Sequence, residues 1–381
     1  MSSEPLAALN RLQNALLALV EPLEEALYRE QAHPQLSALG WHLGHCAFVE
    51  RLWVRGELLG LEEPQADLQE LYLPEHSAKT TRGERLPPAA KLCTWANKSF
   101  AETQELLRTP SSLRRPELLQ ADFLPNFLLQ HHAQHLETMR LALIQWRLRR
   151  PCTGTRSERL GRKAWRRSEW RRLPAGRYRI GTDSRKVFDN ERPPRVAELA
   201  ACRLASRVVS NGDYLEFIRD GGYCSPRWWC REGWRWRERA QCTHPDNWRH
   251  HGDDWYSYGP HGAQPLSANG PLAGVNLYEA RAYATWAGAR LPHEYEWEAA
   301  ARLGLLDDIG LAWEWCDNRF HPYPGFRAYP YARYSTPWFD GRHYVLRGSS
   351  VHSSGAIRRP SFRNFYTAEQ RHICAGIRLA K

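Results

Sequence analysis

Apolar residues recur at the spacing of an α-helix in four stretches of the first 150 residues. These stretches are 4–30, 36–60, 88–108 and 122–149. Pro34 and Ser37 mark the first junction, and Pro125 lies in the opening turn of the last helix, where proline is tolerated. Four helices with one long connection, 61–87, predict a helical bundle with a site between facing helices.

The pattern changes from about residue 174 onward. Helical periodicity becomes rare there, glycine and proline are frequent, and eleven of the seventeen tryptophans occur in this part. Short helices are predicted at 211–219, 277–286 and 294–302, among short strands and long loops held by aromatic side chains. The sequence therefore predicts an α+β multidomain protein, with a helical bundle over 1–150, a basic linker over 151–173 and an α+β domain over 174–381.

Composition limits where the protein works. No run of 18 apolar residues exists, so no membrane span is expected. The N-terminal stretch carries acidic residues and no basic leader, which is typical of an amphipathic helix and not of a signal peptide. The nine cysteines are an odd number and form no C-x-x-C pair, so we expect a reducing compartment, the cytoplasm. We expect Cys224 and Cys230 to be buried free thiols, with a disulfide or shared metal as the alternative.

The net charge of +11 is concentrated in one segment. Residues 147–172 hold eleven Lys or Arg and two Glu, so most of the excess lies in the predicted linker. No motif that reads a nucleic-acid groove accompanies the charge, so we predict no nucleic-acid partner.

The histidines of the fourth predicted helix carry the first indication of chemistry. In QHHAQHLE, residues 130–137, His131 and His135 are four apart, so both imidazoles project from one face and can share a metal ion. His132 stands where a zinc protease has its general-base glutamate, so that class is excluded. Spacing alone leaves open that these histidines simply line a polar helix face.

A second cluster lies on the second predicted helix, in WHLGHCAFVERLW, residues 41–53. His45 shares a helical face with Trp41 and other apolar residues, so it should point into the bundle and need a partner. Three neutral imidazoles, His45, His131 and His135, would leave coordination positions open, as a catalytic metal requires, but would supply no ligand charge. His42 and His132 are the competing histidines, predicted to support the ligands or to lie at the surface.

Motifs along nearly the whole chain resemble one known family. They are WHLGH (41–45), QHHAQHLE (130–137), FDNERPPR (188–195), SNGDYLEFIRDGGY (210–223), GVNLYEARAYATWAGARLPHEYEWEAAA (274–301), WEWCDNRFHPYPGFRAYPYARYS (313–335), VLRGSS (345–350), FRNFY (362–366) and AGIRLA (375–380). The N-terminal half resembles the DinB-like four-helix bundle, and the C-terminal half resembles the formylglycine-generating-enzyme fold, a C-type-lectin relative. This fusion is the architecture of the ergothioneine-type sulfoxide synthases.

The resemblance implies a mononuclear Fe(II) site held by His45, His131 and His135, with O₂ as co-substrate and trimethylhistidine (hercynine) as acceptor. By position, Gln134, Tyr334 and Asn364 contact hercynine, and Tyr331 is the oxygen-activating tyrosine. For both tyrosines, filling an aromatic core is the alternative. Formylglycine generation itself is disfavoured, because Cys316 and Cys374 stand alone and form no copper-binding pair.

The resemblance also bears on the donor of the sulfur or selenium atom. Arg82 and Arg85 match two family arginines that hold the donor carboxylate, with a solvated loop as the alternative. The family usually reads RNWD where this chain reads Arg363-Asn364-Phe365-Tyr366, so the aspartate that pairs with the donor ammonium is missing. A neutral donor would not need that anion.

The leading hypothesis is therefore a selenoneine synthase, a sister group that uses a seleno-sugar as donor, with Phe365 and Tyr366 against the sugar or the trimethylammonium. An ergothioneine-type sulfoxide synthase using γ-glutamylcysteine or cysteine is the alternative within the same class. A DinB-like metal-dependent thiol transferase, distinguished by consuming no oxygen, and a non-catalytic binding protein are further alternatives.

Overall fold

The structure is a computed structural model that describes residues 3–61, 66–110, 112–150, 168–252 and 254–381. The chain forms two units. The helical unit comprises Met1–Arg149 together with the short segments Arg185–Val187 and Ser353–Ile357. The C-terminal unit comprises Arg150–Ser184, Phe188–His352 and Arg358–Lys381. The predicted α+β multidomain class, with a helical N-terminal part, is confirmed.

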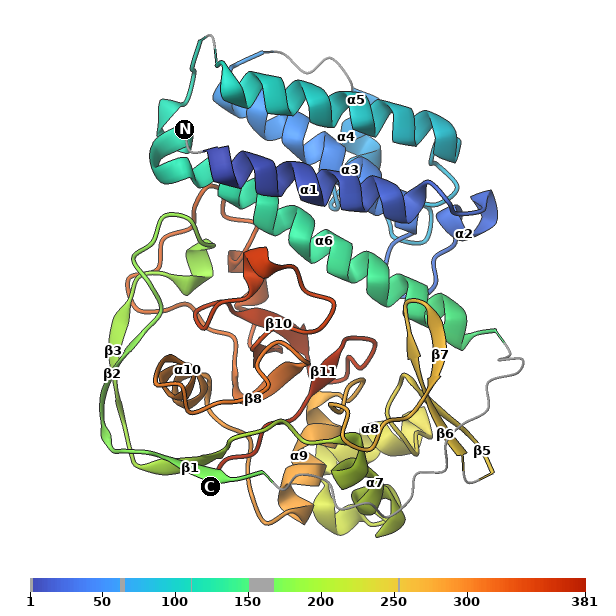
Figure 1. Ribbon diagram of the computed structural model, residues 1–381, viewed down its shortest axis with the longest axis vertical. Coiled ribbons are helices and arrows are strands. Elements are labelled where there is room, and N and C mark those ends of the chain that lie inside the picture. Colours follow the sequence, from blue (N-terminus) through green and yellow to red (C-terminus); the bar gives the residue numbers. More distant parts are fainter. Residues whose placement is uncertain (1–2, 62–65, 111, 151–167, 253) are drawn as a thin grey trace. The chain divides into compact units, whose positions relative to one another are not determined.

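The helical unit is built from long helices that run alongside one another (Figure 1). Contacts join α1 to α5 and α6, and α3 to α5 and α6. Its helices are α1 (Ser3–Val20), α2 (Glu25–Arg29), α3 (Leu39–Arg51), a π-helix that continues α3 (Leu52–Leu58), α4 (Ala66–Tyr72), α5 (Ala89–Arg108), a 3₁₀ segment (Pro116–Asp122) and α6 (Phe123–Leu148).

Two predicted boundaries in this unit were wrong. The helix expected over 4–30 is divided into α1 and α2, because Pro22 has no N–H to donate and prevents the helix from continuing past Val20. The connection expected over 61–87 contains the helix α4. No helix within the described ranges is both long and apolar enough to cross a lipid bilayer.

The segments Arg185–Val187 and Ser353–Ile357 pack on α6, although they are distant from it in sequence. Gln130 donates from Nε2 to the carbonyl of Lys186 at 2.8 Å. Ser353 donates its hydroxyl to Glu137 at 2.7 Å. These bonds attach the helix that carries the histidine motif at two points of its length.

The C-terminal unit contains one four-stranded sheet and smaller strand groups (Figure 1). In the larger sheet the order is β10-β9-β8-β11, with β9 antiparallel to both neighbours and β11 parallel to β8. The strands are β1 (Trp170–Leu173), β2 (Gly176–Ile180), β3 (Arg195–Leu199), β4 (Cys202–Ala205), β5 (Trp248–His251), β6 (Asp254–Gly259), β7 (Gly262–Pro265), β8 (Trp313–Arg319), β9 (His343–Arg347), β10 (Asn364–Thr367) and β11 (Ala375–Gly376). The pairs β1–β4 and β2–β3 and the meander β5-β6-β7 form the rest.

The predicted linker 151–173 overlaps this unit. Residues 151–167 of it lie outside the described residues, and β1 already begins at Trp170. The C-terminal fold therefore starts a few residues earlier than the sequence indicated.

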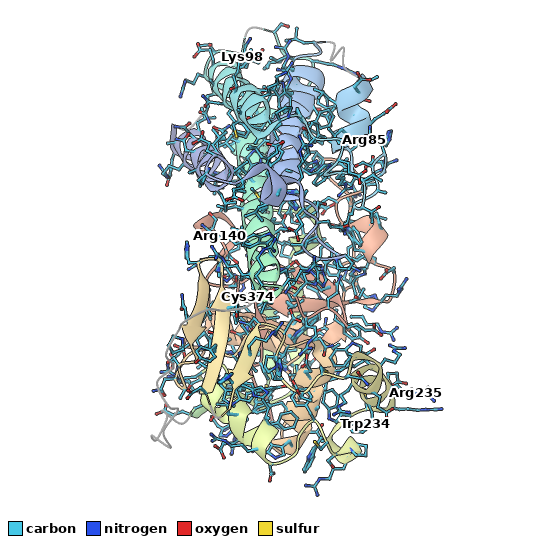
Figure 2. The ribbon with its side chains drawn as sticks, turned by 90° about the vertical axis from the view of Figure 1, so that its right-hand side faces the viewer. Arg85, Lys98, Arg140, Trp234, Arg235 and Cys374 are labelled. Atoms are coloured by element: carbon cyan, nitrogen blue, oxygen red, sulfur yellow. The ribbon has the colours of Figure 1, made fainter. Side chains whose placement is uncertain are left out.

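Among the described residues of this unit, three of the four α-helices were predicted with their correct ends: α7 (Asn211–Arg219), α9 (Leu277–Trp286) and α10 (Glu294–Arg302). In the structure, Ser210 and Asn276 cap α7 and α9 by accepting from the backbone N–H of the third residue of each helix. The fourth, α8 (Arg231–Ala240), was missed because its residues are mostly charged. Figure 2 shows Trp234 and Arg235 on this helix, with Arg235 pointing away from the ribbon.

Cys224 and Cys230 were expected to be buried thiols. Both are free, as predicted, but both side chains are exposed. Cys230 precedes α8 and its sulfur accepts from the Gly233 amide at 3.3 Å, so it caps a surface helix and does not fill a core.

Buried ion pairs hold the C-terminal unit together. Glu294, at the start of α10, accepts from Arg347 on β9 at 2.7 Å and from Arg363 at 2.8 Å. All three side chains are at most 2% exposed. Burial opposes the charge of Glu294, but the two guanidinium groups outweigh it and lower the pKa of the carboxyl from 4.5 to about 2.

We predict that Glu294→Gln destabilises the protein by about 3–5 kcal/mol, because two buried guanidinium groups lose their shared anion. The pKa is lowered in the folded state, so the stabilisation is present above about pH 4.5 and is lost as the pH falls toward 2. The melting temperatures of variant and unmodified protein should therefore converge in acid. Glu216→Gln, which removes an exposed partner of Arg219, is the control and should melt almost normally. Equal melting temperatures of the two variants at pH 7 would contradict this prediction.

Candidate functional site

Facing positions of α3 and α6 bring three histidines together. The imidazole nitrogens of His45, His131 and His135 that could serve as ligands all lie within 4.8 Å of one another. Among the described residues one further group meets the same criterion, Cys46 with His131 and His132, and it shares His131 with the first. These are the three histidines that the sequence predicted as metal ligands, and their role as ligands stays a prediction.

Two glycines let neighbouring segments approach α3 closely. A Cβ on Gly40 would lie 2.1 Å from the Tyr28 ring, and one on Gly44 would lie 2.3 Å from the Tyr72 ring. The four-residue spacing of the glycines places both tyrosines on one side of α3, so larger residues there would displace them. This packing matters because Tyr72 contributes directly to the histidine cluster.

The orientation of His45 is fixed by a hydrogen bond at one ring nitrogen and by an aromatic ring stacked on it. Its Nδ1 donates to the Tyr72 carbonyl at 2.7 Å, which leaves Nε2 with a free lone pair. The Trp41 ring stacks on the imidazole of His45, with 4.7 Å between the ring centroids. The Arg82 guanidinium in turn lies 3.8 Å from the centroid of the Trp41 ring. His45 Nε2 then lies 3.2 Å from Nε2 of His131.

The imidazoles of this cluster are uncharged. Burial lowers the pKa of His45 to about 4 and that of His42 to about 3. Burial, together with the neighbouring histidines, also holds the pKa of His131 and of His135 well below the usual value of 6.5. At neutral pH these rings are therefore neutral and can offer lone pairs to a metal ion.

The competing histidines, His42 and His132, each contact one of the candidate ligands. His42 Nδ1 lies 2.9 Å from His135 Nδ1, and His132 Nδ1 lies 3.3 Å from His131 Nδ1. Both rings are buried, so of the two predicted alternatives the supporting role fits and the surface position does not. The other ring nitrogen of His132, Nε2, lies 2.7 Å from Oε1 of the buried Glu50 carboxylate.

The hydrogen bonds of the histidines bear on which group the cluster could hold. His45 uses its proton at Nδ1, and if His131 donates from Nδ1 to His132, two lone pairs face each other across 3.2 Å. Two acceptors at this distance repel unless a cation lies between or beside them. Three neutral nitrogen donors suit a divalent transition metal such as Fe(II), so the residues present fit the metal that the sequence indicated.

The other predicted residues of the helical unit have different surroundings. Gln134 is half-buried on α6, one residue before His135, and its backbone carbonyl accepts from Thr138 at 2.9 Å. The guanidinium of Arg82 is 3% exposed and donates to Ser37 and Ser77 hydroxyls and to the Pro74 and Ser77 carbonyls. This arrangement gives Arg82 a structural role.

Arg85, the second predicted arginine, is exposed at the edge of the helical unit (Figure 2). It pairs with Glu70 at 3.5 Å. Its surroundings agree with the solvated loop that the sequence left open. Donor binding by Arg82 and Arg85 stays a prediction.

The predicted tyrosines lie in one loop of the C-terminal unit. Tyr331 and Tyr334 are both half-buried, and the Tyr334 ring stacks on Phe188 at 4.0 Å. Asp189, the residue after Phe188, accepts from the Ser335 hydroxyl and from the Tyr329 amide. Burial raises the pKa of Asp189 to about 6, against the opposing effect of these hydrogen bonds. The FDNE motif thus holds the ends of the tyrosine loop.

Strand β10 separates the last three predicted residues. Asn364 and Tyr366 alternate with Phe365 along the strand, so they project from the opposite face. The Phe365 ring stacks on Phe320 at 4.3 Å and packs against the main core, which favours a core role for it. Asn364 and Tyr366 are half-buried, and their contacts with substrate stay predictions.

Comparison with known proteins gives these two units names. The DinB superfamily matches residues 8–139, and the sulfatase-modifying factor enzyme 1-like domain matches residues 159–304 and 301–381. A protein of Mycobacterium tuberculosis named hercynine oxygenase is 32% identical, with 100% of this chain and 99% of that protein covered. The chain belongs to the hercynine oxygenase family.

Further relatives agree with this assignment. The hercynine oxygenase of Mycolicibacterium smegmatis is 31% identical over 96% of this chain and 95% of its own length. Ergothioneine biosynthesis protein 1 of Schizosaccharomyces pombe is 26% identical over 51% of this chain and 27% of its own length. The family resemblance drawn from the motifs is confirmed, whereas no comparison distinguishes the selenoneine branch.

Several residues of this hercynine oxygenase family member were missed by sequence reasoning. Glu50 lies within the apolar stretch AFVERLW, and an acidic residue on a bundle-facing position could have indicated a buried partner of a histidine. Asp189 and Ser335 fell inside recognised motifs without being assigned a task. Their roles depend on contacts between distant segments, which spacing along one helix does not reveal.

We predict that His135→Ala abolishes metal binding, because it removes one of three neutral ligands and strands His42, while the fold survives. Iron per chain after anaerobic loading should fall from one to near zero, and the far-ultraviolet circular dichroism spectrum should be unchanged. His76→Ala, at an exposed histidine of the same unit, should retain full metal content. Stoichiometric iron in the His135 variant would show that the ligand assignment is wrong.

Proposed function

We propose that this protein is an O₂-dependent, non-heme Fe(II) oxidoreductase that joins a chalcogen atom to C2 of the hercynine imidazole. The observation that carries the proposal is the cluster of His45, His131 and His135, whose candidate ligand nitrogens lie within 4.8 Å of one another. It occurs in a chain that matches proteins named hercynine oxygenase over its whole length. His45, His131 and His135 would hold Fe(II), which would supply the redox chemistry with O₂.

The protein's own residues then bind and orient the organic substrate. In the helical unit, Gln134 lies between the candidate ligands His131 and His135 on α6 and offers an amide to the hercynine ring. In the C-terminal unit, we assign hercynine binding to Tyr334, whose ring is fixed by Phe188, and to Asn364 on β10. Holding C2 of the imidazole toward the donor chalcogen is catalysis by positioning.

Tyr331 is the residue we assign to proton or hydrogen-atom delivery during oxygen activation. Its loop is held at Tyr329 and Ser335 by Asp189, so the hydroxyl has a defined position in the C-terminal unit. Directing oxygen chemistry toward carbon–chalcogen bond formation requires such delivery at the right moment, because the donor alone is easily oxidised.

We predict that Tyr331→Phe retains hercynine binding and diverts turnover from the coupled product to oxidised donor. The phenyl ring keeps the packing, so only the exchangeable hydrogen is lost. Product ratios measured by mass spectrometry, with hercynine affinity measured separately by calorimetry, check this. Tyr178→Phe removes a hydroxyl that donates to the Pro174 carbonyl and should leave both quantities unchanged. An unaltered product ratio in the Tyr331 variant would reduce Tyr331 to a packing residue.

Within this class we assign selenium as the transferred atom, with a seleno-sugar as donor, as in the selenoneine synthases. The supporting residue is Tyr366, which stands where the ergothioneine-type enzymes carry an aspartate. It shares a face of β10 with Asn364, so the missing anion belongs on the substrate-binding face of the strand. A donor without an ammonium group does not need that anion.

The surroundings of Arg82 and Arg85 give little support to a donor that carries a carboxylate. Arg82 uses its donors on Ser37, Ser77 and the Pro74 carbonyl, and Arg85 pairs with Glu70. Neither guanidinium is therefore held ready for a donor carboxylate. The alternative, an ergothioneine-type sulfoxide synthase using γ-glutamylcysteine or cysteine, relies on one of them changing its partners.

We predict that seleno-glucose outcompetes γ-glutamylcysteine as donor in the unmodified enzyme, and that Tyr366→Asp partly restores the use of the amino-acid thiol. An ion pair to the donor ammonium at a half-buried position is worth about 1.4 kcal/mol, or roughly tenfold in relative kcat/KM. Tyr366→Asn, which is isosteric with the aspartate but uncharged, is the control and should not restore thiol use. The measurement is competition with both donors in aerobic reactions containing Fe(II) and hercynine. A clear preference of the unmodified enzyme for γ-glutamylcysteine would exclude the selenium assignment and favour the alternative.

A further inference from the structure

Glu50, on α3, is an acid buried without a cationic side chain beside it. Its carboxylate is 0% exposed. Oε1 accepts from Gln13 Nε2 at 2.7 Å and lies 2.7 Å from His132 Nε2. Oε2 is buried and has no hydrogen-bond partner among the described residues. No lysine or arginine of the described residues pairs with Glu50, so its charge is compensated only through His132.

The hydrogen-bond partners define the direction of the chain that leads from Glu50. Gln104 donates to Gln13 Oε1 at 3.0 Å, which turns the Gln13 amide N–H toward Glu50. A carboxylate only accepts, so His132 donates from Nε2, and a His132 with a single ring proton then accepts at Nδ1. With His132 accepting, His131 donates from its Nδ1, which lies 3.3 Å from Nδ1 of His132.

This chain leaves the lone pair of His131 at Nε2, the nitrogen that faces His45 across 3.2 Å. A carboxylate that receives the outer N–H of a metal-bound histidine fixes its tautomer and raises its basicity. Here a second imidazole, His132, stands between the carboxylate and the candidate ligand. The order is Glu50, His132, His131 and then the space shared with His45 and His135.

We propose that Glu50 and His132 are positioning residues of the metal centre, and that Glu50 supplies the negative charge that the three-imidazole ligand set lacks. A buried anion without a cation is costly, so the metal-free protein bears a penalty that a divalent cation at the cluster relieves. Metal binding and the burial of Glu50 therefore stabilise each other. This inference rests on the metal site of the proposed function and not on the reaction assigned to it.

The proposal separates metal affinity from the stability of the metal-free protein. Glu50→Gln keeps the size of the side chain and an oxygen that can accept from His132, but removes the charge. Affinity for Co(II), the probe metal, should fall about ten- to a hundred-fold, as for other residues that support a ligating histidine. The metal-free variant should melt at the same temperature as the unmodified protein or higher, because an uncompensated buried charge has been removed.

Glu102→Gln is the matched control in the same unit. Glu102, on α5, pairs with Arg51 at 3.1 Å and with Arg55, and no contact joins it to the histidines among the described residues. Its loss should lower the melting temperature of the metal-free protein and leave Co(II) affinity unchanged. Glu50→Asp, which keeps the charge, should bind Co(II) more tightly than Glu50→Gln and so separate loss of charge from loss of shape.

Affinity is measured by titration of the Co(II) visible absorption bands, and stability by thermal melting with and without metal. His132→Gln gives a second test if Glu50→Gln does not fold, and should also weaken binding. Lowered metal-free stability with unchanged affinity in Glu50→Gln would overturn the inference and make Glu50 a purely structural residue. An unmodified protein that binds no divalent metal would instead overturn the metal site on which the proposed function depends.

Discussion

Five imidazoles shared between α3 and α6 impose the constraint on which the helical unit depends. His42 contacts His135, and His45 contacts His131, which in turn contacts His132. Rings buried so closely cannot all carry charge, and burial lowers the pKa of His42, His45, His131 and His135, so these four are neutral and the position of each proton depends on its acceptor. The backbone carbonyl of Tyr72 and the carboxylate of Glu50 are the acceptors at the two ends of the longer chain.

That constraint explains features that look unrelated in the sequence. A side chain at Gly44 would clash with the ring of Tyr72, the residue whose carbonyl orients His45. Arg82 is buried because it stacks on Trp41, the indole that covers His45. Gln13 and Gln104, on α1 and α5, continue the polar path from Glu50 to the other two long helices. Helices α1, α3, α5 and α6 therefore all contribute residues to the hydrogen bonds that orient the histidine ring nitrogens.

The sequence predicted the parts of this arrangement that follow from helical periodicity. His131 and His135 share a face because they are four residues apart, and His45 shares a face with Trp41 for the same reason. The division at Pro22, the helix α4 and the tasks of Arg82 and Glu50 were not predicted. Each of these depends on packing between segments distant in sequence, or on a local stop that the apolar pattern overrode. The family motifs named the right residues of the tyrosine loop but gave no reason for Asp189, whose partners Tyr329 and Ser335 lie some 140 residues later.

In the C-terminal unit, buried glutamate side chains are neutralised by arginines of the same unit. Its buried glutamates pair with arginines: Glu294 with Arg347 and Arg363, and Glu314 with Arg378. Glu50 of the helical unit is buried as completely but meets only a glutamine and a histidine. Every fully buried glutamate described in the C-terminal unit pairs with an arginine, so a fully buried glutamate without one marks a place where the cation comes from elsewhere. The physical difference between the two units is therefore that one completes its charges with its own side chains, whereas the other holds a charge that a bound metal ion would balance.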